Sequence, residues 1–121
     1  MQNAAQAYGK VAKQTSSPRE MEAGLLLKAA ARLQSVSDGW GDNREHIEDA
    51  LLYNRKLWSI FLTSVTRQDN PLPELIRQNV ANLGVFVMSQ TVSLMAEPKQ
   101  EKLGTLISIN RELAAGLMGR G

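Results

Sequence analysis

The sequence predicts an all-α fold: a single-domain helical bundle of four longer helices, with a short helix at the N-terminus. Apolar residues recur every three or four positions in four long segments, which is the period of an amphipathic helix. Glycine and proline interrupt this pattern between the segments. The β-prone run 84–88 lies inside one of the long helical periods, so it is assigned to a helix.

The first two long helices each begin at a capping box, in which a polar N-cap residue is followed three positions later by glutamate. Residues 17–20 (SPRE) form the first box, with Pro18 at the first helical position, and the apolar period predicts a helix to about Ser37. Residues 42–45 (DNRE) form the second box and open a helix over 42–66. The apolar arc of this second helix is wide, which indicates that other elements contact it on more than one side.

Proline delimits the last two long helices. The segment 70–73 (NPLP) ends the second helix, because two prolines cannot continue an α-helix. Apolar residues from Leu75 to Met95 predict the third helix, and Pro98 separates it from a fourth helix that ends near Leu117.

The two ends of the chain complete the predicted domain, which spans residues 1–121. Ala4, Ala7, Tyr8 and Val11 have helical spacing and predict the short N-terminal helix, which Gly9 weakens. Residues 1–3 and 119–121 are expected to fray.

Composition supports one globular domain of ordinary character. The 121 residues are 43% hydrophobic and 21% charged, and the absence of cysteine excludes disulfides and thiolate chemistry. The formal net charge is only +2, and no concentrated basic patch of the kind typical of nucleic-acid binders is visible. The polar N-terminus and the lack of a run of about 20 apolar residues predict a cytoplasmic protein that does not enter a membrane.

The sequence contains no recognisable catalytic or cofactor-binding constellation. His46 is the only histidine, so it lacks the further ligands that a metal or haem site in a bundle needs. Phosphate-binding glycine loops and nucleophile elbows are also absent. We therefore expect a protein that binds another protein, without cofactor or metal, and that is not an enzyme.

Several asparagine and aromatic residues on the apolar stripes could lie either in the core or on the surface. Asn54, Asn79, Asn82 and Asn110 fall on or beside these stripes, where they would either make a satisfied core hydrogen bond or line a groove for a partner helix. Among the aromatic residues, the pattern favours the core for Trp58, Phe61 and Phe86, whereas Trp40 fits a core residue and an exposed anchor equally well.

Seven segments along the chain resemble the FlaF family of flagellar biosynthesis regulators. The resemblance covers nearly the whole chain, and it rests on the joint order of the segments more than on any one of them. They are residues 6–10 (QAYGK), 17–20 (SPRE), 25–30 (LLLKAA), 50–58 (ALLYNRKLW), 70–73 (NPLP), 76–84 (IRQNVANLG) and 107–117 (ISINRELAAGL).

The resemblance implies a cytoplasmic protein that binds flagellin as a chaperone and promotes flagellin synthesis, secretion and filament assembly. Flagellin is the implied partner, through its amphipathic terminal helices, and the FlbT regulator is a possible second partner. The candidate partner-binding residues are Tyr53, Asn54, Arg55, Trp58, Asn79, Asn82, Asn110 and Arg111.

An alternative function is post-transcriptional regulation, by direct action on flagellin messenger RNA or through FlbT. RNA recognition requires a basic surface with aromatic residues for base stacking. Arg55, Lys56 and Arg77 with Tyr53 are the residues that could form a small surface of this kind.

Overall fold

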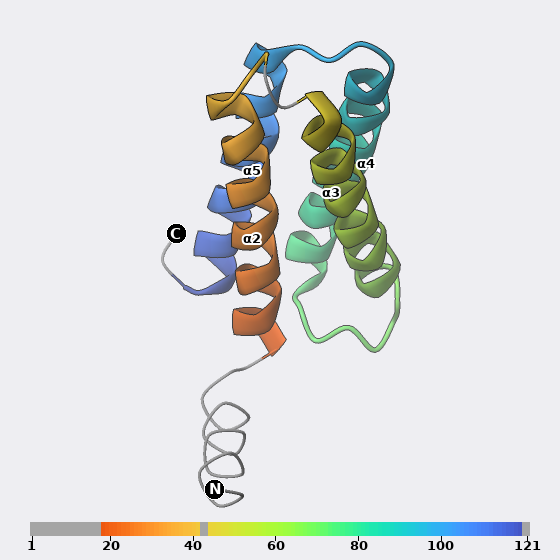
Figure 1. Ribbon diagram of the computed structural model, residues 1–121. Helices are drawn as coiled ribbons and strands as arrows, with labels where there is room; N and C mark the ends of the chain where they lie inside the picture. The colour runs from red at the N-terminus through yellow and green to blue at the C-terminus, as the bar shows by residue number, and fades with distance from the viewer. Residues whose placement is uncertain (1–17, 42–43, 120–121) are drawn as a thin grey trace, which may run out of the picture.

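The computed structural model describes residues 18–41 and 44–119, and these residues form four helices (Figure 1). The short helix expected at Ala4–Val11 lies outside the described residues, as do Ser17, Asp42 and Asn43 of the two expected capping boxes. The described part of the chain contains no strand, so the all-α prediction is confirmed. The helices are α2 (Pro18–Asp38), α3 (Arg44–Val65), α4 (Glu74–Ala96) and α5 (Gln100–Leu117).

The breaks between helices follow from glycine, asparagine and proline chemistry. After α2 the chain turns at Gly41, whose φ of 101° is readily adopted only by glycine. After α3, the Asn70 side chain folds the loop back: its Nδ2 donates to the Ser64 carbonyl oxygen at 3.1 Å, and its Oδ1 accepts from the Leu72 backbone N–H at 3.0 Å. Pro73 then stands at the N-cap of α4.

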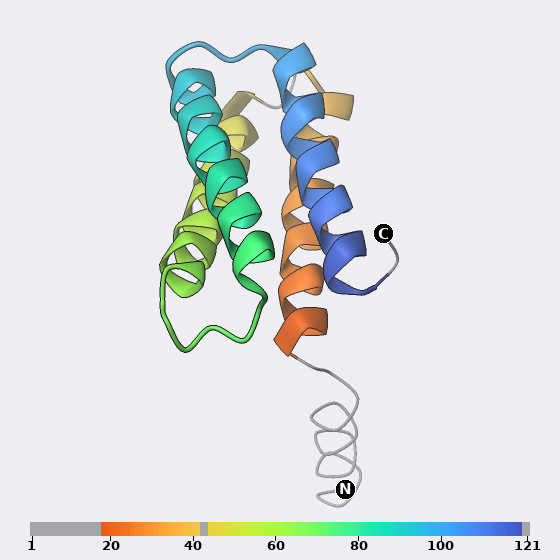
Figure 2. The ribbon, with the colours of Figure 1, turned by 180° about the vertical axis from the view of Figure 1, so that it is seen from behind.

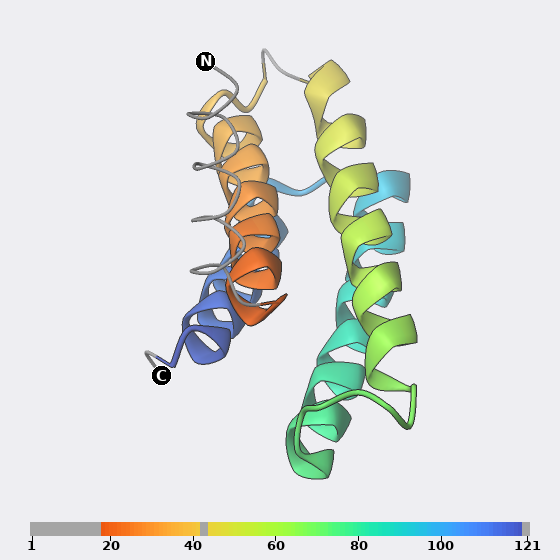
Figure 3. The same cartoon turned by 90° about the horizontal axis from the view of Figure 1, so that it is seen from below.

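The four helices form an antiparallel bundle made of two pairs. The helix α2 packs most extensively on α5, and α3 packs most extensively on α4. The two pairs are joined chiefly through α2 and α3, whereas α4 and α5 have little backbone contact with each other. Figure 3, seen from below, shows the α2–α5 pair beside the α3–α4 pair. Figure 2 shows α4 and α5 on the face opposite to α2 and α3.

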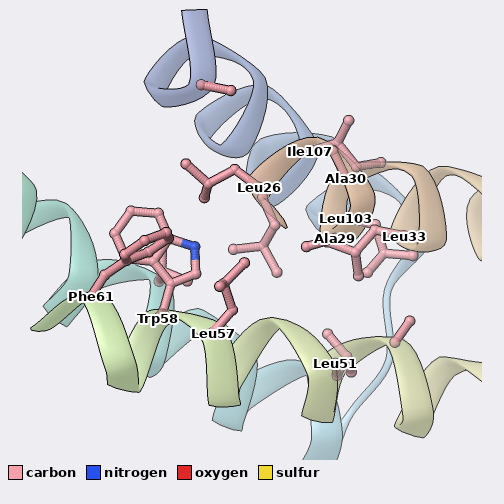
Figure 4. Packing of buried hydrophobic residues seen from close by; sticks show 14 of the residues in the cluster. Leu26, Ala29, Ala30, Leu33, Leu51, Leu57, Trp58, Phe61, Leu103 and Ile107 are labelled. Carbon is pink, nitrogen blue, oxygen red and sulfur yellow. The ribbon is translucent and has the colours of Figure 1, made fainter. Parts of the chain in front are cut away.

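One hydrophobic core runs between the two pairs and takes residues from all four helices. Leu26, Leu33 and Leu103 are fully buried, as is Trp58 of α3; Leu26 lies toward Trp58, whereas Leu33 and Leu103 lie near Leu51 (Figure 4). Trp58 meets Phe61 edge to face, with 5.7 Å between ring centroids and an interplanar angle of 83°. Burying a side chain of this size contributes about 1.5–3 kcal/mol, so this cluster provides most of the driving force for folding.

The structure confirms two of the core assignments made for aromatic residues and contradicts a third. Trp58 and Phe61 are buried as expected, and Trp40 is half-buried against the core. The core assignment of Phe86 is wrong, because its side chain is 44% exposed on α4. The wide apolar arc of α3 is explained by its position, since it contacts α2 on one side and α4 on the other.

Candidate partner-binding surface

Three of the candidate residues form a polar chain inside the core. Trp58 Nε1 donates to Asn110 Oδ1 at 2.9 Å, and Asn110 Nδ2 donates to Asn54 Oδ1 at 2.7 Å. All three side chains are 0% exposed. The chain links α3 to α5, two helices with little backbone contact, so it ties the bundle together across its diagonal.

This burial corrects the placement of Asn54, Trp58 and Asn110 on a partner-binding surface. A side chain with no exposed area cannot touch a partner while the bundle stays closed. The other interpretation of the asparagines, a core hydrogen bond, describes them better. The hydrogen bonding of Asn54 is incomplete, because its Nδ2 is buried without a hydrogen-bond partner among the described residues.

Tyr53 contacts α2 and does not present a free ring. The Arg32 guanidinium lies 4.3 Å from its ring centroid and the Lys28 ammonium 6.0 Å. Both cations come from α2, so the half-buried Tyr53 ring helps to hold α2 against α3.

The structure does not assemble the basic and aromatic surface that RNA binding would use. Tyr53 and Arg55 are two positions apart on α3, a rotation of about 200°, so they lie on opposite sides of the helix. Lys56 is exposed, while Arg77 is half-buried on α4, where its Nη1 donates to the Arg67 carbonyl oxygen at 3.1 Å. The Arg32 guanidinium lies over the Tyr53 ring, in a position that a stacked base would need.

Arg111 lies on the outer seam between α5 and α2. Its Nη2 is 3.5 Å from Gln34 Oε1. Farther along the same seam, Gln100 Nε2 donates to the Ser37 carbonyl oxygen at 2.8 Å. These contacts belong to the α2–α5 pair, so Arg111 is separated from the candidate residues on α4.

Asn79 and Asn82 are the candidates that share an exposed apolar surface. They lie on α4 with Leu75, Leu83 and Phe86, and all five side chains are exposed. The spacing of these positions, i, i+4, i+7, i+8 and i+11, places them along one side of the helix. Leu75 is 70% exposed and Leu83 is 36% exposed. We call these five residues the α4 face.

Most of α4 lacks charged side chains, on the α4 face and beside it. Residues 78–96 carry no charged side chain, although a large part of the helix surface is exposed. Val85 and Val92 form a second exposed apolar stripe, seven positions apart. The buried side of the helix holds Val80, Gly84, Val87, Thr91 and Leu94.

Sequence reasoning missed Leu75, Leu83 and Phe86 as surface residues because they fit the apolar period of the predicted third helix, and it did not single out Val85 and Val92. The signal that could have identified them is the charge-free run 78–96. A helix with one buried and one solvent-exposed side normally carries charges on the exposed side. Exposed apolar side chains gathered on one helix mark an interaction site more often than scattered ones do.

Other features of the described residues point to no chemistry. No group of three or more His, Asp or Glu side chains in these ranges is placed to hold a metal ion. The pockets are open surface depressions, such as one of about 490 Å³ beside Ile60, Thr63 and Asn70. None of the helices in these ranges combines the length and hydropathy needed to cross a membrane.

A comparison with known protein families finds the same family that the order of segments along the chain indicates. The family model described as flagellar protein FlaF matches residues 4–117, a range that includes all four helices. No curated protein and no solved structure matches the chain significantly. Since the family match extends over almost the entire sequence, the chain belongs to the FlaF family of flagellar proteins.

Proposed function

We propose that this flagellar protein binds flagellin in the cytoplasm, as a chaperone that promotes flagellin synthesis, secretion and filament assembly. The α4 face is the proposed binding surface, and its exposed, charge-free apolar character is the observation that carries the proposal. Membership of a flagellar protein family supports a partner from the flagellum.

The chemistry of the α4 face suits an amphipathic helix. Leu75, Leu83 and Phe86 repeat at helical spacing, so the apolar stripe of a second helix can pack along them. Asn79 and Asn82 stand in the same row, and their amides both donate and accept hydrogen bonds. Flagellin has amphipathic terminal helices that pack only in the filament, and covering them before export would prevent premature assembly.

The second stripe on α4, formed by Val85 and Val92, bears on how many partner helices bind. Val85 and Val92 lie to one side of the α4 face, roughly a quarter turn or more around the helix from Phe86. One partner helix covers a single stripe, whereas two helices seated side by side would cover both. Simultaneous binding of the N- and C-terminal flagellin segments is the arrangement that buries both stripes.

Calorimetry with flagellin and its isolated terminal segments tests the proposal. Binding should persist at high salt, because burial of an uncharged surface releases few counterions. Leu83→Ser and Phe86→Ser should each weaken binding by about tenfold or more, equivalent to about 1.4 kcal/mol or more. Leu52→Ser is the matched control, since Leu52 is 41% exposed but lies on α3, and it should leave the affinity unchanged.

Three outcomes would contradict the proposal in different ways. An absence of flagellin binding would remove it, and FlbT would be the next partner to measure. Equal losses for Leu83→Ser and Leu52→Ser would remove the α4 face as the site. Binding to flagellin messenger RNA that weakens steeply with salt would favour the post-transcriptional alternative.

A further inference from the structure

The chain crosses between the two helix pairs at one end of the bundle, at the top of Figure 1. There α2 ends and α3 begins, and α4 ends and α5 begins. At the opposite end, the loop 66–73 joins α3 to α4 within one pair, α2 begins and α5 ends. We call the first the linked end and the second the open end. For the four described helices, the backbone therefore connects the α2–α5 pair to the α3–α4 pair at the linked end alone.

The core is made of larger side chains at the linked end than at the open end. The last buried residues of the four helices toward the linked end are Val36, Ile47, Leu94 and Leu103. The last buried residues toward the open end, which we call the open-end layer, are Ala23, Val65, Val80 and Ala114. Alanine and valine bury less apolar surface than leucine and isoleucine. The open-end layer therefore holds the two pairs together less strongly.

Packing within each pair is more extensive than packing between the pairs. The buried chain of Trp58, Asn110 and Asn54 joins the pairs, and α3 and α5 each continue about two turns beyond it, to Val65 and Leu117. Asn54 Nδ2 is buried without a hydrogen-bond partner among the described residues. Water would supply that partner if the pairs separated, which lowers the free energy cost of breaking this chain.

We propose that the bundle opens at the open end, where the α2–α5 pair swings away from the α3–α4 pair about the linked end. Each pair moves as a unit, because its internal packing is the more extensive. The motion breaks the hydrogen bond between Trp58 and Asn110 and exposes the open-end layer to solvent, while the core at the linked end stays closed. Openings of this kind cost less free energy than global unfolding, because they break only part of the apolar core.

The opening would act on the α4 face, which begins at the same end. Leu75 and Asn79 lie in the first turns of α4, and Asn79 is next to Val80 of the open-end layer. A partner helix on the α4 face that reaches Val80 would bind the open form more tightly and increase its population. This consequence rests on the proposed function, whereas the opening is a property of the free chain and is tested on it alone.

Thiol labelling of the full chain measures the opening, because the parent contains no cysteine and each variant carries one. Val80→Cys reports on the open end and Val36→Cys on the linked end, and these valines are 5% and 4% exposed. Ala114→Cys and Ala50→Cys form a second matched pair, with alanines that are 1% and 4% exposed. Each rate is divided by the rate of the same variant unfolded in urea. The two open-end thiols should react about tenfold or more faster than the two linked-end thiols.

One opening exposes both open-end thiols, so their normalised rates should agree. The rates should rise with urea less steeply than global unfolding does, because the opening exposes less surface. Equal rates at both ends, or the urea dependence of global unfolding, would overturn the proposal. Fast labelling of Ala114→Cys alone would also overturn it, because fraying of α5 would explain that result. Ala23→Cys or Val65→Cys, from the same layer, replaces any open-end variant that changes the circular dichroism spectrum.

Discussion

Trp58 Nε1 donates a hydrogen bond of 2.9 Å to Asn110 Oδ1, and this bond joins two helices that lie diagonally across the bundle. The indole of α3 and the amide of α5 are both fully buried, and Asn110 continues the chain to Asn54. A buried donor or acceptor is costly when its partner is missing. The pairing therefore favours the one arrangement of α3 and α5 in which these groups meet.

Replacing Asn110 should destabilise the protein more than replacing Asn54. Asn110→Ala removes both hydrogen bonds and leaves Trp58 Nε1 buried without an acceptor, which should cost about 2–3 kcal/mol. Asn54→Ala removes one hydrogen bond, but it also removes the Nδ2 group that has no partner, so about 1 kcal/mol is expected. Urea denaturation of both variants measures the difference, and equal losses would show that the chain of hydrogen bonds does not act as described.

Two glycines should respond to alanine with opposite signs. A Cβ at Gly84 would lie against the Leu62 side chain, 2.7 Å from its Cγ, so Gly84→Ala should push α3 and α4 apart and cost about 1–2 kcal/mol. Gly104 of α5 has nothing within 4 Å of an added Cβ, and Gly104→Ala should stabilise the helix by about 0.5–1 kcal/mol. Thermal unfolding compares the two variants. A gain in stability for Gly84→Ala would mean that Leu62 rotates away at little cost.

Glu22 should make the bundle less stable as the pH rises. Partial burial raises the pKa of the Glu22 carboxyl above its usual value of 4.5, and the nearby Arg19 opposes this only in part. The folded state therefore binds the proton more tightly than the unfolded state does. The free energy of unfolding should fall as the pH increases from about 4.5 through the raised pKa.

Glu22→Gln should remove this pH-dependent penalty. The variant should be more stable than the parent at pH 7, and the difference should shrink toward pH 4, where the parent carboxyl is protonated. Melting temperatures of both proteins across this range provide the measurement. A constant difference over the range would show that the effect of Glu22→Gln is not linked to ionisation.

Tyr53 should contribute to stability and not to partner binding. Its ring lies against Arg32, and a contact of this kind contributes about 0.5–1 kcal/mol at an exposed site. Tyr53→Leu should destabilise the bundle by roughly that amount, and Tyr53→Phe should not, because phenylalanine keeps the ring. A double-mutant cycle with Arg32→Gln isolates the pair. A loss of flagellin affinity in Tyr53→Leu equal to that in Leu83→Ser would instead return Tyr53 to the binding surface.

The sequence by itself determined the four long helices and the breaks between them. Periodicity of apolar residues and the conformational limits of proline and glycine are local properties, so they place Pro73, Pro98 and Gly41 correctly without knowledge of the fold. The order of short segments along the chain was sufficient to indicate the FlaF family, which the match over residues 4–117 confirms.

Only the tertiary structure decided which apolar and amide residues are buried. Asn54 and Asn110 look like Asn79 and Asn82 in the sequence, as Phe61 looks like Phe86, because all of them fit a helical apolar period. Helical period defines a face, but a face is buried only where another helix covers it. The helix α3 is covered by both α2 and α4, whereas α4 packs mainly on α3 and has little contact with α5, so its remaining apolar side chains stay exposed to solvent.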